Sequence, residues 1–257
     1  MNPAELAVVI AIGLFVGMAV CLEVGYRLGN YASRKTETAH EGTGTIEAAI
    51  FALLGLLLGF TFANGMSHLD QRRQLIVQEA NAIGTAYLRL DLLPADRQRE
   101  MRVLFRQYLD ARLEAYEKLP DLNAAGQELA QASKLQQEIW LRAVAASRDD
   151  PTQNLARLLL PALNDMIDVT TSRTIALHTH LPHLIFGLSI TVALLSGLMA
   201  GYNMAKRRSR SWFHVLVYSA AIAITIFTVV DLDYPRFGLI RLTAADTALT
   251  QLRDSIR

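Results

Sequence analysis

The amino-acid sequence predicts an all-α integral membrane protein, with four transmembrane helices and an extramembrane helical bundle between the second and third of them. The chain has 257 residues, of which 52% are hydrophobic, and its charged residues are segregated into a dense middle region between long apolar stretches. Such segregation is typical of a membrane protein with a soluble insert rather than of a single globular domain. Within the charged middle, hydrophobic residues recur at helical spacing.

Four apolar stretches have roughly the 20 residues that a helix needs to cross the hydrocarbon core of a bilayer. We interpret the first as a retained span rather than a signal peptide, because "MNPAEL" contains no basic residue and the positive charges follow the apolar run. Trp212 and Phe213 open the last stretch as an interfacial aromatic anchor. The four predicted spans are Leu6–Leu22, Thr45–Ala63, His183–Tyr202 and Ser211–Val230.

The distribution of Lys and Arg predicts which side of the membrane each loop faces. The loops between spans one and two and between spans three and four carry more of these residues than the opposite side does, which favours a cytoplasmic location for both loops. We therefore expect a multi-pass protein of the cell (inner) membrane, with the insert and both termini outside the cytoplasm. The residues compared are Arg27, Arg34, Lys35, Lys206, Arg207, Arg208 and Arg210 in the loops, against Arg72, Arg73, Arg173, Arg236 and Arg241.

The insert is predicted to form four helices. The first continues span two as one rod from about Thr45 to Leu93, roughly 70 Å long at 1.5 Å per residue. Pro94 and "LPDLN" mark the next two turns, and "RDDP" predicts the fourth helix, with Asp150 as N-cap, Pro151 in the first turn and a kink at Pro161. The residues expected in the core are Ile76, Ala80, Ile83, Tyr87, Leu90, Met101, Phe105, Tyr108, Leu129, Leu135 and Ile139.

An even number of helices returns the chain to the membrane, so an up-down-up-down bundle satisfies the connections with short loops. A coiled-coil hairpin lying away from the bundle is the alternative arrangement. The predicted organisation is residues 1–64 for spans one and two, 65–181 for the insert, 182–232 for spans three and four, and 233–257 for a short C-terminal tail.

Three of the predicted spans contain the pattern GxxxG. Small residues at this spacing let helix backbones approach closely in lipid, where packing rather than water exclusion holds helices together. Packing within the chain is the ordinary use of each pair, and contact between subunits is the alternative use of at least one. The pairs are Gly13–Gly17, Gly55–Gly59 and Gly197–Gly201.

Span two presents Leu56, Phe60 and Asn64 on one helix face that ends in a polar residue. In an oligomer, such a face is a candidate pore wall, where an apolar constriction gates by dewetting. Contact with lipid or with a neighbouring helix is the alternative interpretation. Glu47, in the first turn of the same span, either has a function as an intramembrane carboxylate or simply reaches the interface.

The charged half of the rod also has two interpretations. Arg72, Arg73 and Glu79 either lie on a solvated helix face, where ion pairs contribute little, or belong to a bundle core or a vestibule that attracts ions. Asn81 is grouped with them under the second interpretation.

Histidines lie at both ends of the insert, close to one membrane surface, where Asp231 and Asp233 also leave span four. Histidine and carboxylate are common metal ligands, but "HTHLPH" is not a recognised zinc spacing. We therefore expect no metal or other cofactor. The candidates that come nearest are His68, His178, His180 and His183.

The sequence contains no pattern typical of an enzyme: P-loop, GxSxG, HExxH and CxxC are all absent. The net charge of +1, without a basic tract that carries interleaved aromatics, gives no sign of nucleic-acid binding. We therefore expect a protein that is not an enzyme and whose partners are the lipid bilayer, further copies of itself and inorganic ions.

Two motifs, "RRQLIVQEANAIGTAYLRLDLLP" and "DLDYPRFGLIRL", together with spans arranged two plus two, resemble the bestrophin-like family of membrane proteins over nearly the whole chain. The resemblance implies ion conduction, because bestrophins are pentameric anion channels whose second span lines the pore. It does not extend to calcium gating, since the acidic calcium clasp of bestrophins is not seen in this sequence.

These expectations lead to one main hypothesis of function. The protein is expected to be a homo-oligomeric ion channel, anion-conducting by resemblance, with Leu56, Phe60 and Asn64 as pore wall and with Arg72, Arg73 and Glu79 as vestibule charges. The competing hypothesis is a non-conducting membrane scaffold or sensor whose extramembrane bundle binds a partner.

Overall fold

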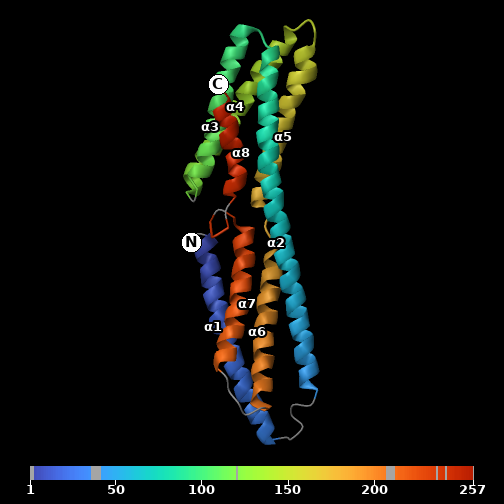
Figure 1. Ribbon diagram of the computed structural model, residues 1–257, viewed down its shortest axis with the longest axis vertical. Coiled ribbons are helices and arrows are strands. Elements are labelled where there is room, and N and C mark those ends of the chain that lie inside the picture. The colour runs from blue at the N-terminus through green and yellow to red at the C-terminus, as the bar shows by residue number, and fades with distance from the viewer. Residues whose placement is uncertain are drawn as a thin grey trace. The chain divides into compact units, whose positions relative to one another are not determined.

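The computed structural model describes residues 3–35, 42–119, 121–206, 212–235, 237–240 and 242–256, most of which are helical (Figure 1). Four helices in these ranges are long and apolar enough to cross a membrane, and by length and composition the chain is a multi-pass membrane protein. The chain divides into two compact units. The membrane unit is Met1–His68 with His180–Leu239, and the bundle unit is Leu69–Thr179 with Ile240–Arg257.

The membrane unit contains α1 (Pro3–Lys35), the first part of α2 (Thr43–Leu88), α6 (His183–Lys206) and α7 (Trp212–Asp233). Helix α1 packs closely against both α6 and α7, whereas α2 makes few close backbone approaches to the other three. The core of this unit is apolar and includes Leu14, Met18, Leu54, Leu58, Val192, Ala193, Ile226 and Val230.

Glycines allow the close approach of α1 to α6. A Cβ on Gly201 would overlap the carbonyl group of Leu22, and a Cβ on Gly25 would overlap that of Leu198. Gly29 is held in the same way against Tyr202. Because backbone lies against backbone here, any side chain at these positions would force the two helices apart.

Helix α1 is longer than the predicted span and continues to Lys35. Arg27, Arg34 and Lys35, expected in a loop, therefore lie on the helix, and the Arg27 Nε donates to Glu23 one turn earlier at 2.8 Å. Such a pair stabilises the additional turns. Arg207, Arg208, Arg210, Arg236 and Arg241, which also entered the orientation comparison, lie outside the described residues.

The bundle unit contains the rest of α2, η1 (Arg89–Leu92), α3 (Ala95–Glu117), α4 (Leu122–Arg148), η2 (Leu155–Leu159), α5 (Leu160–His178) and α8 (Thr243–Ser255). Successive long helices α2, α3, α4 and α5 alternate in direction, as the up-down-up-down arrangement requires (Figure 1). Nine of the eleven predicted core positions are buried, and Ile76, Ile83, Leu90, Phe105, Tyr108 and Ile139 are at most 1% exposed. The other two, Tyr87 and Leu129, are half-buried.

The C-terminal segment, predicted as a tail, instead carries α8 and belongs to the bundle unit. Leu249 is fully buried, and the Arg253 Nε donates to Asp110 on α3 at 2.9 Å. Gly84 on α2 leaves room for Leu252. A helix of 13 residues is marginal by itself in water, so α8 depends on this docking.

The fourth helix of the insert begins later than predicted, because Asp150 caps a turn instead of the helix. The Asp150 carboxylate accepts from the Leu155 amide at 2.8 Å and the Thr152 amide at 2.9 Å, and these hydrogen bonds hold the pKa of Asp150 below its usual value. The π-helical turn η2 follows, with Leu160 donating to Leu155, and Pro161 lies in the first turn of α5. The wider turn moves backbone carbonyls away from the proline ring.

Candidate functional site

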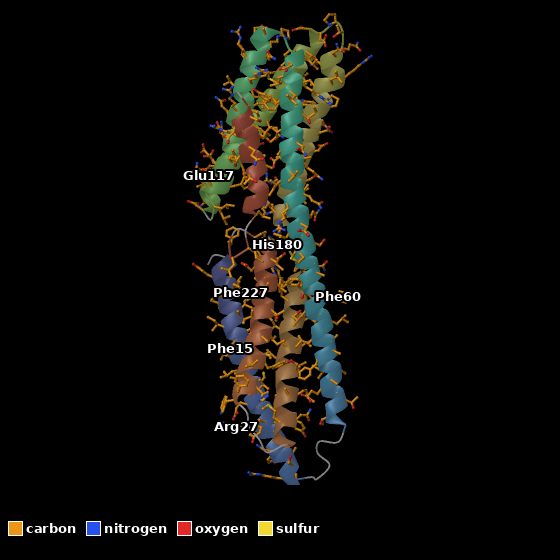
Figure 2. The ribbon with its side chains drawn as sticks, in the orientation of Figure 1. Phe15, Arg27, Phe60, Glu117, His180 and Phe227 are labelled. Atoms are coloured by element: carbon orange, nitrogen blue, oxygen red, sulfur yellow. The ribbon has the colours of Figure 1, made fainter. Side chains whose placement is uncertain are left out.

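The outer face of α2 in the membrane unit is the first candidate site. Leu56 and Phe60 are 55% and 63% exposed, and Asn64 is also exposed (Phe60 is labelled in Figure 2). The opposite face carries Leu54, Leu58 and Thr61 into the core. The three predicted pore residues therefore share one face that the rest of the described chain leaves uncovered.

The glycines of the three GxxxG pairs fall into two groups. Gly17 and Gly197 face Leu194 and Met18 at the contact between α1 and α6, where Gly201 also lies. Built Cβ atoms at the other three glycines have no described atom within 4 Å, and these positions are Gly13, Gly55 and Gly59. For them the expected packing within the chain is wrong. The pair Gly25–Gly29 was missed because Arg27 between them suggested a loop.

Glu47 is half-buried and hydrogen-bonded rather than free at the interface. The Asn203 Nδ2 donates to its carboxylate at 2.6 Å, and the Thr43 hydroxyl donates to the Asn203 Oδ1 at 2.7 Å. Glu47 also lines a pocket of about 590 Å³ with Phe51, Asn203 and Tyr218. An amide partner lowers the cost of placing this carboxylate at the membrane.

Glu79 lies at the centre of a buried charge cluster in the bundle unit, formed with Arg112 and Arg173. Its side chain is fully buried, and the two arginine side chains are 4% and 3% exposed. The Arg112 Nε donates to the Glu79 Oε1 at 2.7 Å, and the Arg173 Nη1 donates to the Glu79 Oε2. One carboxylate on α2 therefore holds one guanidinium from α3 and one from α5.

Tyr116 supports both arginines. Its hydroxyl accepts from the Arg112 Nη2 at 3.0 Å, and the Arg173 guanidinium lies 4.2 Å from its ring centroid. Such cation–π contact is favourable when the cation is desolvated. Although burial by itself disfavours the charge, Tyr116 and Glu79 outweigh it and raise the pKa of Arg112, which therefore stays protonated.

The three predicted vestibule charges have separate surroundings. Arg72 is 3% exposed and caps the end of α5, since its Nε donates to the Ala176 carbonyl at 3.1 Å and its Nη2 to the Thr179 carbonyl at 2.8 Å. Arg73 is exposed and pairs with Asp70 at 3.3 Å. The solvated-face interpretation is wrong for Arg72 and Glu79, whereas Arg73 and Asn81 do lie on an exposed face.

The second family motif, "DLDYPRFGLIRL", folds around two buried carboxylates in the membrane unit. Asp233 is fully buried and accepts from the Leu181 amide at 3.2 Å. Asp231 accepts from the Leu239 amide at 3.1 Å, and Gly238 lies so close that a Cβ would overlap the Asp231 carboxylate. Asp231 therefore holds the turn of the motif to the end of α7, while Asp233 holds the segment that precedes α6.

Two of the four candidate histidines approach Asp233. The Nδ1 of His180 lies 3.5 Å from one carboxylate oxygen and that of His68 lies 3.8 Å from the other, while the His180 ring stacks on Tyr234. His178 and His183 are exposed. Within the described ranges, no group of three or more His, Cys, Asp or Glu side chains is arranged so that it could hold a metal ion.

A family model described as the bestrophin-like domain matches residues 8–246. Neither the comparison with curated proteins nor the comparison with solved structures gives a match.

Proposed function

The chain belongs to the bestrophin-like family, and from this premise we propose that it forms a homo-oligomeric channel for passive ion conduction, lined by the outer face of α2. Anions are the expected permeant ions, because the family takes its name from anion channels. The observation that carries the proposal is the uncovered face of Leu56, Phe60 and Asn64, beside Gly55 and Gly59. A pore helix must leave one face to the axis, and small residues let copies of it approach closely.

Replacing Phe60 with alanine is expected to increase ion flux several-fold, because the ring narrows and dries the apolar part of the pore. The measurement is halide flux into liposomes that contain the purified protein, together with its oligomeric state by native mass spectrometry. Phe62→Ala is the matched control, since Phe62 is also exposed on α2 but points away from the Phe60 face. Equal flux in wild type and Phe60→Ala would show that this face of α2 does not line the pore. A protein that is monomeric or dimeric and gives no flux would contradict the proposal of a channel.

We also place the bundle unit and both termini outside the cytoplasm, on the basis of the basic residues of the short loops. Gln127 is exposed on α4, so Gln127→Cys is expected to react with a membrane-impermeant maleimide in intact cells. The parent protein, whose single cysteine is Cys21 on α1, is the control. If Gln127→Cys is labelled only after the cells are lysed, the bundle unit faces the cytoplasm and the proposed orientation is wrong.

A scaffold or sensor whose bundle binds a partner is the second candidate function. The buried charge cluster favours it, because a channel vestibule has no need of a carboxylate and two guanidinium groups inside a helical bundle.

A further inference from the structure

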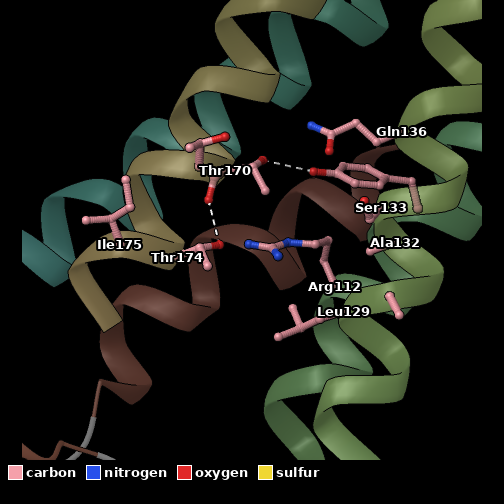
Figure 3. Close-up of a pocket in the computed structure, with 11 residues that line it drawn as sticks. Arg112, Leu129, Ala132, Ser133, Gln136, Thr170, Thr174 and Ile175 are labelled. Atoms are coloured by element: carbon pink, nitrogen blue, oxygen red, sulfur yellow. Dashed lines mark hydrogen bonds between the residues drawn. The ribbon is translucent and has the colours of Figure 1, made fainter. Parts of the chain in front are cut away.

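The bundle unit and the membrane unit each contain a cavity with a charged side chain in its lining. In the bundle unit, a pocket of about 400 Å³ is lined by residues of α3, α4 and α5, and Figure 3 shows the hydrogen bond between Tyr108 and Thr170 in its wall. The charged residue there, Arg112, donates to the Glu79 carboxylate at 2.7 Å. The charge in this pocket therefore has a partner inside the protein, and the cavity of the membrane unit differs in that respect.

The cavity of the membrane unit has a volume of about 590 Å³ and lies where the ends of α2, α6 and α7 come together. Glu47 comes one turn after the start of α2, Asn203 one turn before the end of α6, and Phe213 in the first turn of α7. The cavity therefore lies at the depth where these apolar helices leave the hydrocarbon core for the headgroup region. Its volume is within the range of pockets that hold small organic molecules, roughly 300–1,000 Å³.

Glu47 keeps one carboxylate oxygen available in this cavity. The Asn203 Nδ2 donates to the Glu47 Oε2 at 2.6 Å, and the Asn203 amide is oriented by the Thr43 hydroxyl, which donates to its Oδ1 at 2.7 Å. The Glu47 Oε1 makes no hydrogen bond or ion pair with the residues that the structure describes. Because an amide is neutral, the Asn203 hydrogen bond leaves the charge of the carboxylate unbalanced, and an unbalanced acid in a membrane-spanning region is a candidate binding group.

The rest of the lining suits a cation that carries hydrocarbon. Among the described residues of the lining, Glu47 is the only carboxylate and none is Lys or Arg. The Phe51 and Tyr218 rings have their centroids 5.7 Å apart, Phe213 adds a third ring, and the Tyr218 hydroxyl is engaged with Ser196 at 2.7 Å. The faces of aromatic rings attract cations. The other apolar residues of the lining are Leu22, Ala200, Met204, Val215, Val217 and Ala221.

We propose that this cavity binds an amphiphilic alkylammonium ion, with the ammonium group at Glu47 and the hydrocarbon chain along the apolar lining. An ammonium N–H would give the Oε1 atom a donor and the carboxylate a counter-charge, and such charge-assisted hydrogen bonds are roughly twice as strong as neutral ones. An inorganic cation is disfavoured, because it needs several oxygen ligands and the lining offers one carboxylate. The site is independent of conduction, since Leu56, Phe60 and Asn64 are not part of this lining.

The test is isothermal titration of the full-length protein in detergent with octylammonium, and with 1-octanol as the neutral compound of nearly the same shape. Heats measured with protein-free micelles are subtracted. Because His214 also lines the cavity, the titration is made at about pH 8, where histidine side chains are ordinarily neutral and alkylammonium ions stay charged. Octylammonium is expected to bind at least about 10-fold more tightly than 1-octanol. No binding of octylammonium, or equal binding of the two compounds, would overturn the proposal.

Two variants test the residues. Glu47→Gln is expected to weaken octylammonium binding at least about 10-fold and to leave 1-octanol unaffected, because glutamine can still accept from Asn203 but carries no charge. Phe51→Leu, which keeps an apolar side chain but removes a ring, is expected to weaken it about 3-fold. Glu5→Gln, at an exposed acid of α1 outside the cavity, is the control and should bind as wild type. Unchanged affinity in Glu47→Gln would overturn the site, and unchanged affinity in Phe51→Leu would do so even if Glu47→Gln failed to fold.

The lipid composition of nanodiscs identifies the source of the ammonium group. The full-length protein is compared in phosphatidylcholine alone, whose quaternary ammonium has no N–H group, and in phosphatidylcholine mixed with phosphatidylethanolamine. Octylammonium binding that is several-fold weaker in the mixture supports the site with a lipid headgroup as its occupant, whereas equal affinity supports it with a free amine. Ion flux is measured separately, so that failure of this site and failure of the proposed channel can be told apart.

Discussion

Glu79→Gln is expected to destabilise the bundle unit by about 3–5 kcal/mol, because it removes the buried carboxylate charge that pairs with both the Arg112 and the Arg173 guanidinium groups. Glutamine has nearly the same shape, so the loss measures the charge and not a cavity. The measurement is denaturant-induced unfolding of the purified protein in detergent, followed by circular dichroism.

Glu114→Gln is the matched control for this prediction. Glu114 also pairs with a cation, Lys118, but its side chain is 52% exposed and the two lie one turn apart on the surface. Such pairs contribute about 0–1 kcal/mol. A loss of stability in Glu79→Gln no larger than in Glu114→Gln would show that the cluster does not hold α2, α3 and α5 together.

Gly201→Leu is expected to destabilise the membrane unit by about 3 kcal/mol or more. Inserting methylene groups into a packed core costs about 1–3 kcal/mol when side chains can move aside, and here the obstacle is the backbone of Leu22. The measurement is thermal unfolding in detergent together with the yield of monodisperse protein.

The same substitution at Gly13 separates packing from helix propensity. Gly13 lies on α1 with no described atom within 4 Å of a built Cβ, so Gly13→Leu is expected to be neutral or slightly stabilising. If Gly201→Leu and Gly13→Leu unfold at the same temperature, the close approach of α1 and α6 is not what stabilises the membrane unit.

Local composition was enough to predict the helices and their inward faces. Each apolar span is apparent within its own window, and the seam of Ile76, Ala80, Ile83 and Leu90 follows from helical spacing, which is why burial agrees with it. The ends of the helices were harder to predict where charged residues continue a helix beyond its apolar stretch. Arg27 was assigned to a loop although its pairing with Glu23 continues α1.

The candidate sites could not be predicted from short stretches of sequence, because the residues that form each site come together only when the chain folds. Arg112 and Arg173 lie 33 and 94 residues from Glu79, and nothing in the residues around Glu79 distinguishes a buried carboxylate from a solvated one. The docking of α8 is similar, since Leu249 becomes buried only against helices formed far earlier in the chain.

The amino-acid sequence alone therefore predicted the four spans and the helical insert, because hydropathy and helical periodicity act over neighbouring residues. The family was indicated separately, by the resemblance of two motifs. Only the tertiary structure decided which charges are buried, which glycines serve packing and which face of α2 stays uncovered. The physical reason is that burial and pairing are properties of side chains brought together from distant segments, and their energies depend on the partner as much as on the residue.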